Sequence, residues 1–127
     1  MIFRKVRHKY HAERTNVYGI NFPSKLEANC YKELLLLQKA NLFKFFTRQI
    51  SFDLPGKKTH KVDFCVFYEN GVRFIESKGR DLPMGKLKRE QVEDLYDIEI
   101  FVVKSTKELT KLVQTQGSEC QIILEQN

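Results

Sequence analysis

Residues 61–78 decide the fold, and they read KVDFCVFYENGVRFIESK. Two runs in this stretch, 61–68 and 72–77, are rich in the β-branched and aromatic side chains that favour strands. Between them lies Asn70-Gly71, the kind of dipeptide that most strongly signals a two-residue hairpin turn. The stretch therefore predicts a β-hairpin with Asn70 and Gly71 as its central turn residues.

The outer end of this hairpin carries polar side chains that the register should gather. Counted outward from the predicted turn, Asp63 lies opposite Lys78, and Glu76 lies opposite Cys65. Because side chains alternate between the two faces of a strand, Asp63, Glu76 and Lys78 should emerge on one face. Two acids and a lysine placed in this way are typical of a hydrolytic metal site.

The flanking sequence predicts helices and strands in the order of a mixed α/β sandwich. Ser24-Lys25-Leu26-Glu27 is a capping box that opens a helix running to about Ala40. The remaining expected elements are a strand at 48–54, a helix at 86–96, a buried strand at 98–103, a helix starting after Ser105 or Thr106 and running to about 114, and a short strand or docking tail at 121–124. A helical crossover between the hairpin and the strand at 98–103 makes that strand parallel to the second hairpin strand.

Composition indicates one domain over residues 1–127, with a basic, irregular arm at 1–22, a core at 23–104 and a C-terminal appendage at 105–127. No apolar run approaches the roughly 18 residues of a membrane span, so no membrane partner is expected. No apolar segment follows the basic N-terminal stretch, so a secretory signal is not expected. The 3 cysteines are widely spaced, which argues against a disulfide framework or a zinc ribbon and favours a reducing cytoplasm.

Positive charge is concentrated beside the outer end of the hairpin. The formal net charge is +6, which suggests a polyanionic partner such as nucleic acid. The candidate contacts to nucleic acid are Arg4, Lys5, Arg7 and Lys9 in the arm, Lys58 and Lys61 before Asp63, and Arg80, Lys86 and Arg89 after the hairpin. Gln49, on a neighbouring strand, is a further candidate for contact with substrate or a metal-bound water, and a surface strand glutamine is an equal interpretation.

These residues resemble the PD-(D/E)xK nuclease superfamily. Its members carry an acid on a first helix, an acid on the second strand of a meander, and an acid-x-Lys motif on the third strand. Here Val62-Asp63 stands where the family has Pro-Asp, Glu76-Ser77-Lys78 supplies the acid-x-Lys motif, and Glu27 is similar to the helix acid. The resemblance covers roughly residues 20–103 and is closer still to small phage-encoded members, several of which resolve or cut branched DNA.

The resemblance implies a restriction-endonuclease-like core, in which helices flank a mixed sheet made of an antiparallel meander and one parallel strand. It implies a Mg²⁺-dependent endodeoxyribonuclease, with Mn²⁺ able to substitute, that works as a homodimer on Holliday-junction-like DNA during recombination in the cytoplasm of a phage host. Asp63, Glu76, Glu27 and the backbone carbonyl of Ser77 would hold the metal. Lys78 would orient or deprotonate the attacking water and stabilise charge in the transition state.

Other interpretations remain open at this point. Asp63 and Lys78 could form a simple cross-strand ion pair, and Glu27 could serve only the capping box. The same residues would equally serve a site-specific nicking enzyme, a restriction-like enzyme or a transposase-type endonuclease. A non-catalytic nucleic-acid-binding module that retains the old site as structure is the alternative from a different class.

Overall fold

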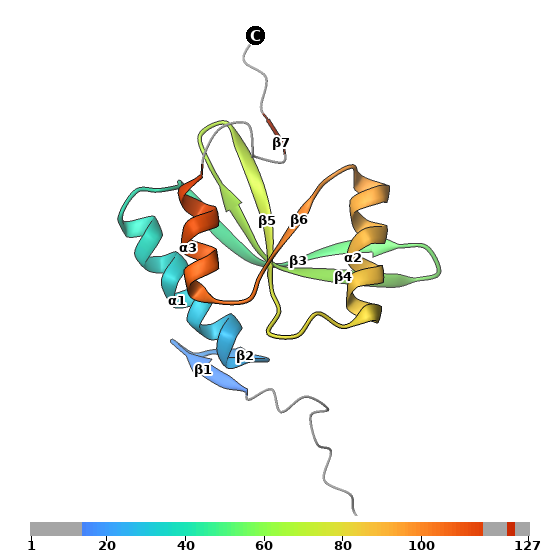
Figure 1. The fold of residues 1–127 in the computed structure, drawn as a ribbon, viewed down its shortest axis with the longest axis horizontal. Helices are drawn as coiled ribbons and strands as arrows, with labels where there is room; N and C mark the ends of the chain where they lie inside the picture. The colour runs from blue at the N-terminus through green and yellow to red at the C-terminus, as the bar shows by residue number, and fades with distance from the viewer. Residues whose placement is uncertain (1–13, 116–121, 124–127) are drawn as a thin grey trace, which may run out of the picture.

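The computed structural model describes residues 14–115 and 122–123. Its elements in chain order are β1 (Thr15–Val17), β2 (Ile20–Phe22), α1 (Lys25–Lys39), β3 (Phe45–Leu54), β4 (Lys58–Phe67), β5 (Gly71–Ser77), α2 (Pro83–Tyr96), β6 (Ile100–Val103), α3 (Thr106–Gln114) and β7 (Ile122–Ile123). Figure 1 shows α1 and α3 on one side of the central sheet and α2 on the other. The chain is therefore α/β, with helices flanking a mixed sheet, as the sequence predicts.

The strands of the central sheet follow the order β3-β4-β5-β6. β3 with β4 and β4 with β5 form antiparallel pairs, whereas β5 and β6 are parallel. The parallel pair follows from α2, which carries the chain back to the starting end of the sheet, because parallel strands need such a crossover. β7 pairs antiparallel with the start of β5. The predicted meander, crossover and parallel strand are all confirmed.

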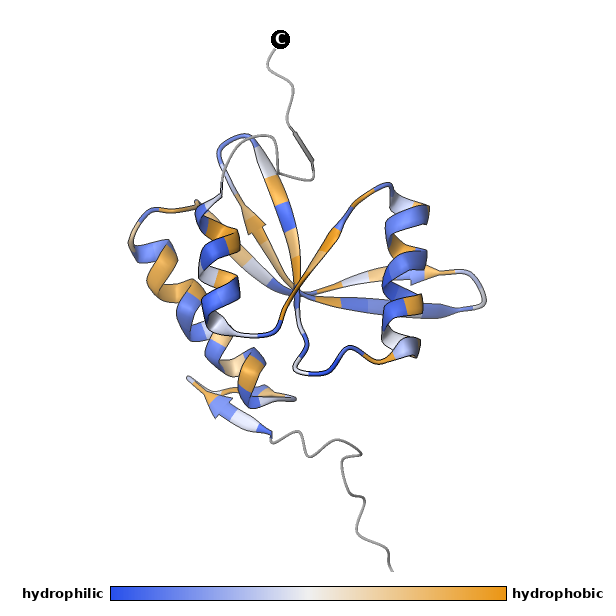
Figure 2. Cartoon of the chain, in the orientation of Figure 1, coloured by the Kyte–Doolittle hydropathy of each residue, from blue (hydrophilic) through white to orange (hydrophobic). Residues whose placement is uncertain are grey.

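Two apolar clusters fill the spaces on either side of the sheet. The cluster under α1 and α3 contains Cys30, Leu34, Leu37, Phe43, Phe64, Val66, Tyr68, Ile75, Val103, Leu109 and Val113. The cluster under α2 contains Leu54, Val62, Cys65, Phe74, Val92 and Ile100. Figure 2 shows the apolar residues of β5 and β6 in the middle of the molecule, between the helices. Charged side chains of the central strands are therefore enclosed by apolar residues on both faces of the sheet.

The hairpin turn lies one residue earlier than the sequence predicts. Glu69 and Asn70 are its central residues, and Gly71 already belongs to β5. The N–H of Tyr68 donates to the carbonyl of Gly71 at 2.7 Å and closes the turn. The predicted turn at Asn70-Gly71 is therefore wrong, although the hairpin itself is confirmed.

The earlier turn displaces the hairpin register by two residues. Cys65 pairs with Phe74, whereas the predicted register placed Glu76 opposite it. The last pair of β4 and β5 is Phe64 with Ile75. If the same register continues by one residue, Asp63 lies opposite Glu76 and not opposite Lys78. Three of the four pairs in the observed register join apolar residues, and the fourth joins Val66 to the buried Arg73. This apolar matching outweighs the preference of the turn dipeptide.

The alternation of faces reverses in β3 and β4 where Gln49 and Asp63 stand opposite each other. Val62 packs in the cluster under α2 and Phe64 in the cluster under α1, although residues two apart on a regular strand share a face. Gln49 has a left-handed backbone, with φ of 55°, and the β3–β4 ladder resumes beyond it at Ile50. This reversal decides which face each polar residue of the site reaches.

The N-terminal segment holds more structure than the predicted irregular arm. β1 and β2 form a two-stranded antiparallel sheet, and Val17 and Phe22 pack against Ala28 of α1. Arg4, Lys5, Arg7 and Lys9 lie outside the described residues, so their expected DNA contacts are not placed.

Some element boundaries also differ from the prediction. β3 begins at 45 and β4 at 58, three residues earlier than predicted in each case, and α2 begins at Pro83 and not at 86. Proline is well tolerated in the first turn of a helix, since its missing N–H has no partner there anyway. β6 begins at 100, two residues later than predicted.

Candidate active site

Glu27 projects from the first turn of α1 toward the sheet. The side chain of Ser24 accepts a hydrogen bond from the Glu27 N–H at 3.1 Å and fixes the start of the helix, as the capping box predicts. The Glu27 carboxylate is buried, with 3% of the residue exposed. It accepts hydrogen bonds from Gln49 Nε2 at 3.2 Å and from Arg48 Nη2 at 3.4 Å. The capping box therefore does not explain why residue 27 is an acid, because the Glu27 carboxylate is hydrogen-bonded to side chains of β3.

Asp63 lies in the middle of β4 and faces Glu27. Its Oδ2 accepts from the backbone N–H of Ser77 at 2.9 Å and from the Ser77 hydroxyl at 3.2 Å. Its carboxyl group is close enough to that of Glu27 for each to affect the pKa of the other, and Asp63 is 7% exposed. Two carboxyl groups from distant parts of the chain thus meet in the interior of the protein.

The pKa of each of these carboxyl groups is raised. Burial is the largest cause for both. The neighbouring Asp63 adds to the effect on Glu27, whose pKa rises from 4.5 to about 7 although Arg48 opposes the rise. The Ser77 N–H and the charge of Lys78 oppose the rise in the pKa of Asp63 without reversing it. Both carboxyl groups therefore hold a proton more tightly than a solvated acid does.

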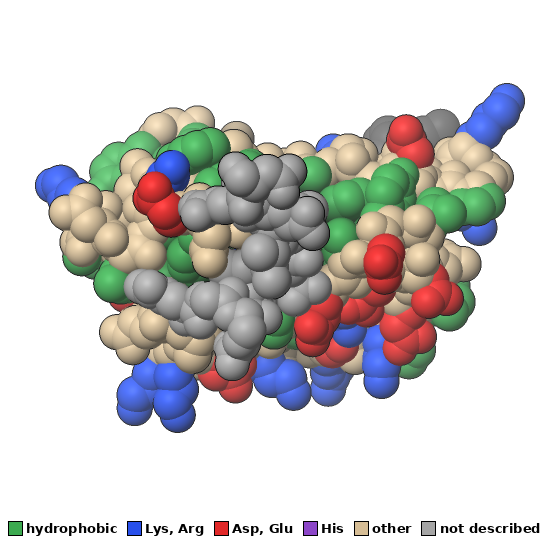
Figure 3. Space-filling model, turned by 90° about the horizontal axis from the view of Figure 1, so that it is seen from above, with side chains coloured by type: hydrophobic (Ala, Val, Ile, Leu, Met, Phe, Trp, Pro, Cys, Tyr) green, Lys and Arg blue, Asp and Glu red, His purple; other side chains and the backbone are tan. Residues whose placement is uncertain are grey.

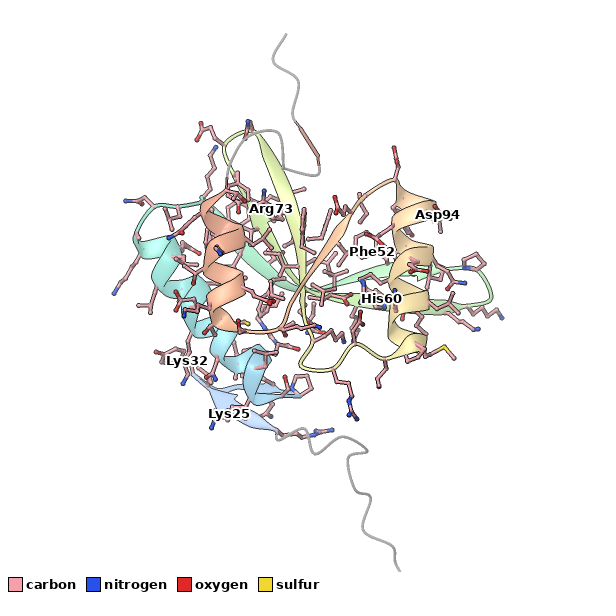
Figure 4. The ribbon with its side chains drawn as sticks, in the orientation of Figure 1. Lys25, Lys32, Phe52, His60, Arg73 and Asp94 are labelled. Atoms are coloured by element: carbon pink, nitrogen blue, oxygen red, sulfur yellow. The ribbon has the colours of Figure 1, made fainter. Side chains whose placement is uncertain are left out.

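Glu76 occupies a separate polar cluster under α2. Its Oε1 contacts His60 Nε2, and its Oε2 lies 3.5 Å from Arg89 Nη1. Arg89 in turn makes two hydrogen bonds to Asp81, at 3.1 and 2.6 Å. All of Glu76 is buried, and its Oε2 accepts no hydrogen bond from any residue in the described part of the chain. Figure 4 shows His60 between β4 and α2.

The acids expected on one face are split between two. Asp63 reaches Glu27 on the α1 side, and Glu76 reaches Arg89 on the α2 side. The prediction that Asp63, Glu76 and Lys78 share one face is wrong, because the reversal at Gln49 and Asp63 breaks the regular alternation on which it relied. Across residues 14–115, no three His, Cys, Asp or Glu side chains are grouped closely enough to hold a metal ion. Glu76 still raises the pKa of Asp63 through its charge.

A cavity of about 400 Å³ opens beside the Glu27–Asp63 pair. Glu27 and Ser24 at the start of α1 form one wall, and residues 77–80 form the other. Lys78 and Arg80 bring positive charge to this second wall. An anionic group that entered the cavity would therefore meet two cations next to a buried acid pair.

The other predicted nucleic-acid contacts fall into two groups. The exposed side chains are those of Lys58, Lys61, Arg80 and Lys86. Arg89 is 6% exposed and paired with acids, so the expectation that it reaches phosphates from a helix surface is wrong. Gln49 is half-buried and donates to Glu27, which links it to the acid pair and not to the surface.

Three polar residues of the site were not expected from the sequence: Arg48, His60 and Asp81. If the predicted strand had begun at 58 instead of 61, it would have included His60. Alternation of faces would then have placed His60 on the same face as Val62. Arg48 lies between two polar residues, Thr47 and Gln49, so the sequence pattern gave no signal for its ion pair with Glu27. Asp81 lies in a predicted loop, where no periodic pattern could have singled it out.

Comparison of the sequence with known protein families assigns the chain to one of them. Residues 7–110 match DUF1064, described as a protein of unknown function, and the chain belongs to this family. No curated protein and no solved structure matches the chain. Within the part that the structure describes, no helix has both the length and the apolar character needed to cross a membrane.

Proposed function

We propose that this DUF1064 protein is a metal-dependent endonuclease that hydrolyses phosphodiester bonds in DNA. The observation that carries the proposal is the Glu27–Asp63 pair, two neighbouring buried carboxyl groups, of which Glu27 lines a cavity that Lys78 also lines. Two neighbouring carboxylates repel each other unless they share a proton or a cation. A fold that builds such a pair next to a cationic cavity is suited to bind a divalent cation and a phosphate.

The donor groups fit a hard divalent cation such as Mg²⁺, with Mn²⁺ as a substitute. Glu27 and Asp63 would hold the ion, with the backbone carbonyl of Ser77 as a further oxygen donor. Glu76 would not join them, because its carboxylate lies in the separate cluster under α2, where it contacts His60 and Arg89. When bound, the ion would neutralise phosphate charge and lower the pKa of a water molecule.

The residues around the pair would bind and orient the substrate. Lys78 and Arg80 line the cavity and would contact the phosphate, with Lys78 placed to stabilise the charge that develops in the transition state. Arg48 and Gln49 fix the Glu27 carboxylate from the sheet side. The acid pair therefore keeps one orientation while the substrate enters.

Branched DNA is the substrate that we propose on resemblance. The stretch Val62-Asp63-Phe64 and the stretch Glu76-Ser77-Lys78-Gly79 are similar to those of small phage-encoded endonucleases that cut branched DNA. The formal net charge of +6 supports binding to a polyanion without selecting its shape. Nuclease chemistry and substrate shape are therefore separate parts of the proposal.

The decisive experiment incubates the protein with supercoiled, linear, single-stranded and four-way-junction DNA, with Mg²⁺ or with a chelator. We expect cleavage with Mg²⁺, none with the chelator, and the fastest cleavage on the junction. Asp63→Asn should abolish cleavage, whereas Asp53→Asn, at an exposed position of β3, should not. If Asp63→Asn cuts as fast as the parent, the assigned site is wrong. Equal rates on the junction and on linear duplex would refute only the branched substrate.

A further inference from the structure

We propose that a groove between α1 and the β1–β2 turn binds an unpaired nucleotide of a DNA strand, with the base stacked on Tyr18 and the phosphates held by lysines of α1. None of the residues that line this groove lines the cavity beside Glu27. The choice of DNA as the occupant rests on the proposed function. The groove itself is defined by its own side chains and charges.

The groove joins apolar, aromatic and basic side chains. Its volume is about 560 Å³, and it is lined by Tyr18, Lys32, Leu35, Leu36, Gln38 and Lys39. Tyr18 is 79% exposed and Leu36 62%. An apolar surface between two lysines suits a ligand that has a flat, apolar part and a negative charge. A nucleotide is such a ligand, since its base stacks on aromatic rings and its phosphate attracts lysine.

The fold does not explain why residue 18 is a tyrosine. Tyr18 and Gly19 form the two-residue turn between β1 and β2, and both have a left-handed backbone, with φ of 51° and 81°. Turns of this kind favour Asn, Asp and Gly, because a larger side chain is strained in this conformation. The ring of Tyr18 is also too exposed to contribute to the core. Both features indicate that the ring serves a contact outside the chain.

The β1–β2 turn holds Tyr18 in a defined place. The side chain of Asn16 accepts a hydrogen bond from the Gly19 N–H at 3.2 Å and donates one to Asn21 at 2.8 Å. Val17 anchors the two strands on α1. A ring that is already positioned loses little conformational freedom when a base stacks on it.

The surface around the groove carries positive charge only. The exposed charged residues between 14 and 40 are Arg14, Lys25, Lys32 and Lys39. The two acids of this segment are turned to other contacts, since Glu27 is buried beside Asp63 and Glu33 accepts a hydrogen bond from Thr110. In the view of Figure 3, most of the acidic side chains gather over the C-terminal end of α2, away from α1. The outer side of α1 therefore attracts a polyanion.

The lysines form a row that connects the groove with the candidate active site. Lys25, Lys32 and Lys39 follow each other at seven residues, or about two helical turns, so they lie on one side of α1. Figure 4 shows Lys32 on the side of α1 that faces away from the sheet. Lys25 directly follows Ser24, which lines the cavity beside Glu27. A strand that leaves this cavity along the lysines therefore reaches Tyr18.

An unpaired strand fits the groove better than a duplex or an acidic peptide does. The faces of a base in a duplex are covered by its neighbours, so Tyr18 can stack only on a base that has left the stack. An acidic peptide would pair with the lysines and leave the exposed ring unused. We therefore take a single strand, or a single-stranded part of a branched molecule, as the occupant.

Fluorescence anisotropy of a short labelled single strand, with a chelator present so that no metal-dependent cleavage occurs, measures binding. Tyr18→Ala should weaken binding about tenfold, because one stacked base is lost. Tyr18→Phe should bind as the parent does, since the ring is kept. Leu95→Ala is the control, because Leu95 is 57% exposed on α2 and should have no effect. If Tyr18→Ala binds as tightly as the parent, the stacking site is wrong.

The salt dependence of binding tests the lysines separately. Lys32→Ala/Lys39→Ala should make the slope of log affinity against log salt shallower by about 1.4, since each phosphate contact contributes about 0.7. Tyr18→Ala should leave the slope unchanged. The matched control is Lys107→Ala/Lys111→Ala, which removes two exposed lysines of α3. A slope that responds equally to both double variants would contradict the row on α1.

Competitors identify the occupant. Duplex DNA of the same sequence should bind more weakly, and its binding should not respond to Tyr18→Ala. Polyglutamate or an RNA strand that displaced the probe as well as unlabelled single-stranded DNA does would overturn the choice of DNA. A protein that binds the strand through Tyr18 and cuts no DNA would refute the nuclease and support the groove. A nuclease whose Tyr18→Ala variant keeps full affinity would refute the groove alone.

Discussion

Raising the pH should destabilise this protein through Glu27. The pKa of this carboxyl is about 7 in the folded chain and 4.5 when it is freely solvated. The folded state therefore holds the proton more tightly than the unfolded state does. The stabilisation from the bound proton is complete below about pH 4.5 and is lost as the pH rises through about 7. A pKa difference of this size corresponds to roughly 3 kcal/mol in the free energy of unfolding.

Urea denaturation followed by circular dichroism, at constant ionic strength from pH 5 to pH 8, measures this loss. Glu27→Gln removes the titrating group and keeps a side chain that can hydrogen-bond to Asp63. We expect the parent to lose more stability than Glu27→Gln over this range, by up to roughly 3 kcal/mol. Glu69→Gln is the control, because Glu69 is exposed on the hairpin turn and should leave the slope unchanged. Parallel pH curves for the parent and Glu27→Gln would refute the buried acid pair.

The same experiment can detect cation binding without any DNA. At pH 8 the Glu27 carboxyl is mostly ionised, since its pKa is about 7, and a divalent cation that binds only the folded state raises the stability of the protein. Millimolar Mg²⁺ or Mn²⁺ should recover part of the stability that the parent loses, and should recover less of it in Asp63→Asn. An equal shift in both proteins would show that the cation acts elsewhere.

Three further substitutions test the polar contacts around the core. Arg89→Met should lower the free energy of unfolding by roughly 3–5 kcal/mol in urea denaturation, because the buried Glu76 loses its cation; a loss near zero would contradict the buried pair. Arg73→Leu should speed amide exchange in α3 more than in α1, since Arg73 Nη1 donates to the carbonyls of Leu112 and Thr115 at the end of α3; uniform exchange would contradict this. Ser24→Ala should cost about 1 kcal/mol in the same unfolding assay, and Ser24→Thr should retain most of the stability.

Local signals predicted the elements of the fold well. The capping residue Ser24, the hairpin with its apolar runs and the crossover into β6 each depend on residues close together in the sequence. The register of the hairpin was missed by two residues, because apolar matching such as Cys65 with Phe74 outweighed the turn preference of Asn70-Gly71. Arg89 was misassigned for a different reason, since a helical pattern does not reveal that a basic residue is buried against an acid on another element.

The faces of the acids could not be predicted, and the cause is the backbone of one residue. Gln49 adopts φ of 55° in the middle of β3, a conformation that costs a non-glycine residue of order 1 kcal/mol or more. Because of it, Arg48 and Gln49 both reach Glu27, whereas a regular strand would send one of them to the opposite face. The two hydrogen bonds that Arg48 and Gln49 donate to the buried Glu27 carboxylate offset part of this strain. No propensity of glutamine foretells this backbone, so a sequence can name Asp63 and Glu76 as site residues and still assign them to the wrong faces.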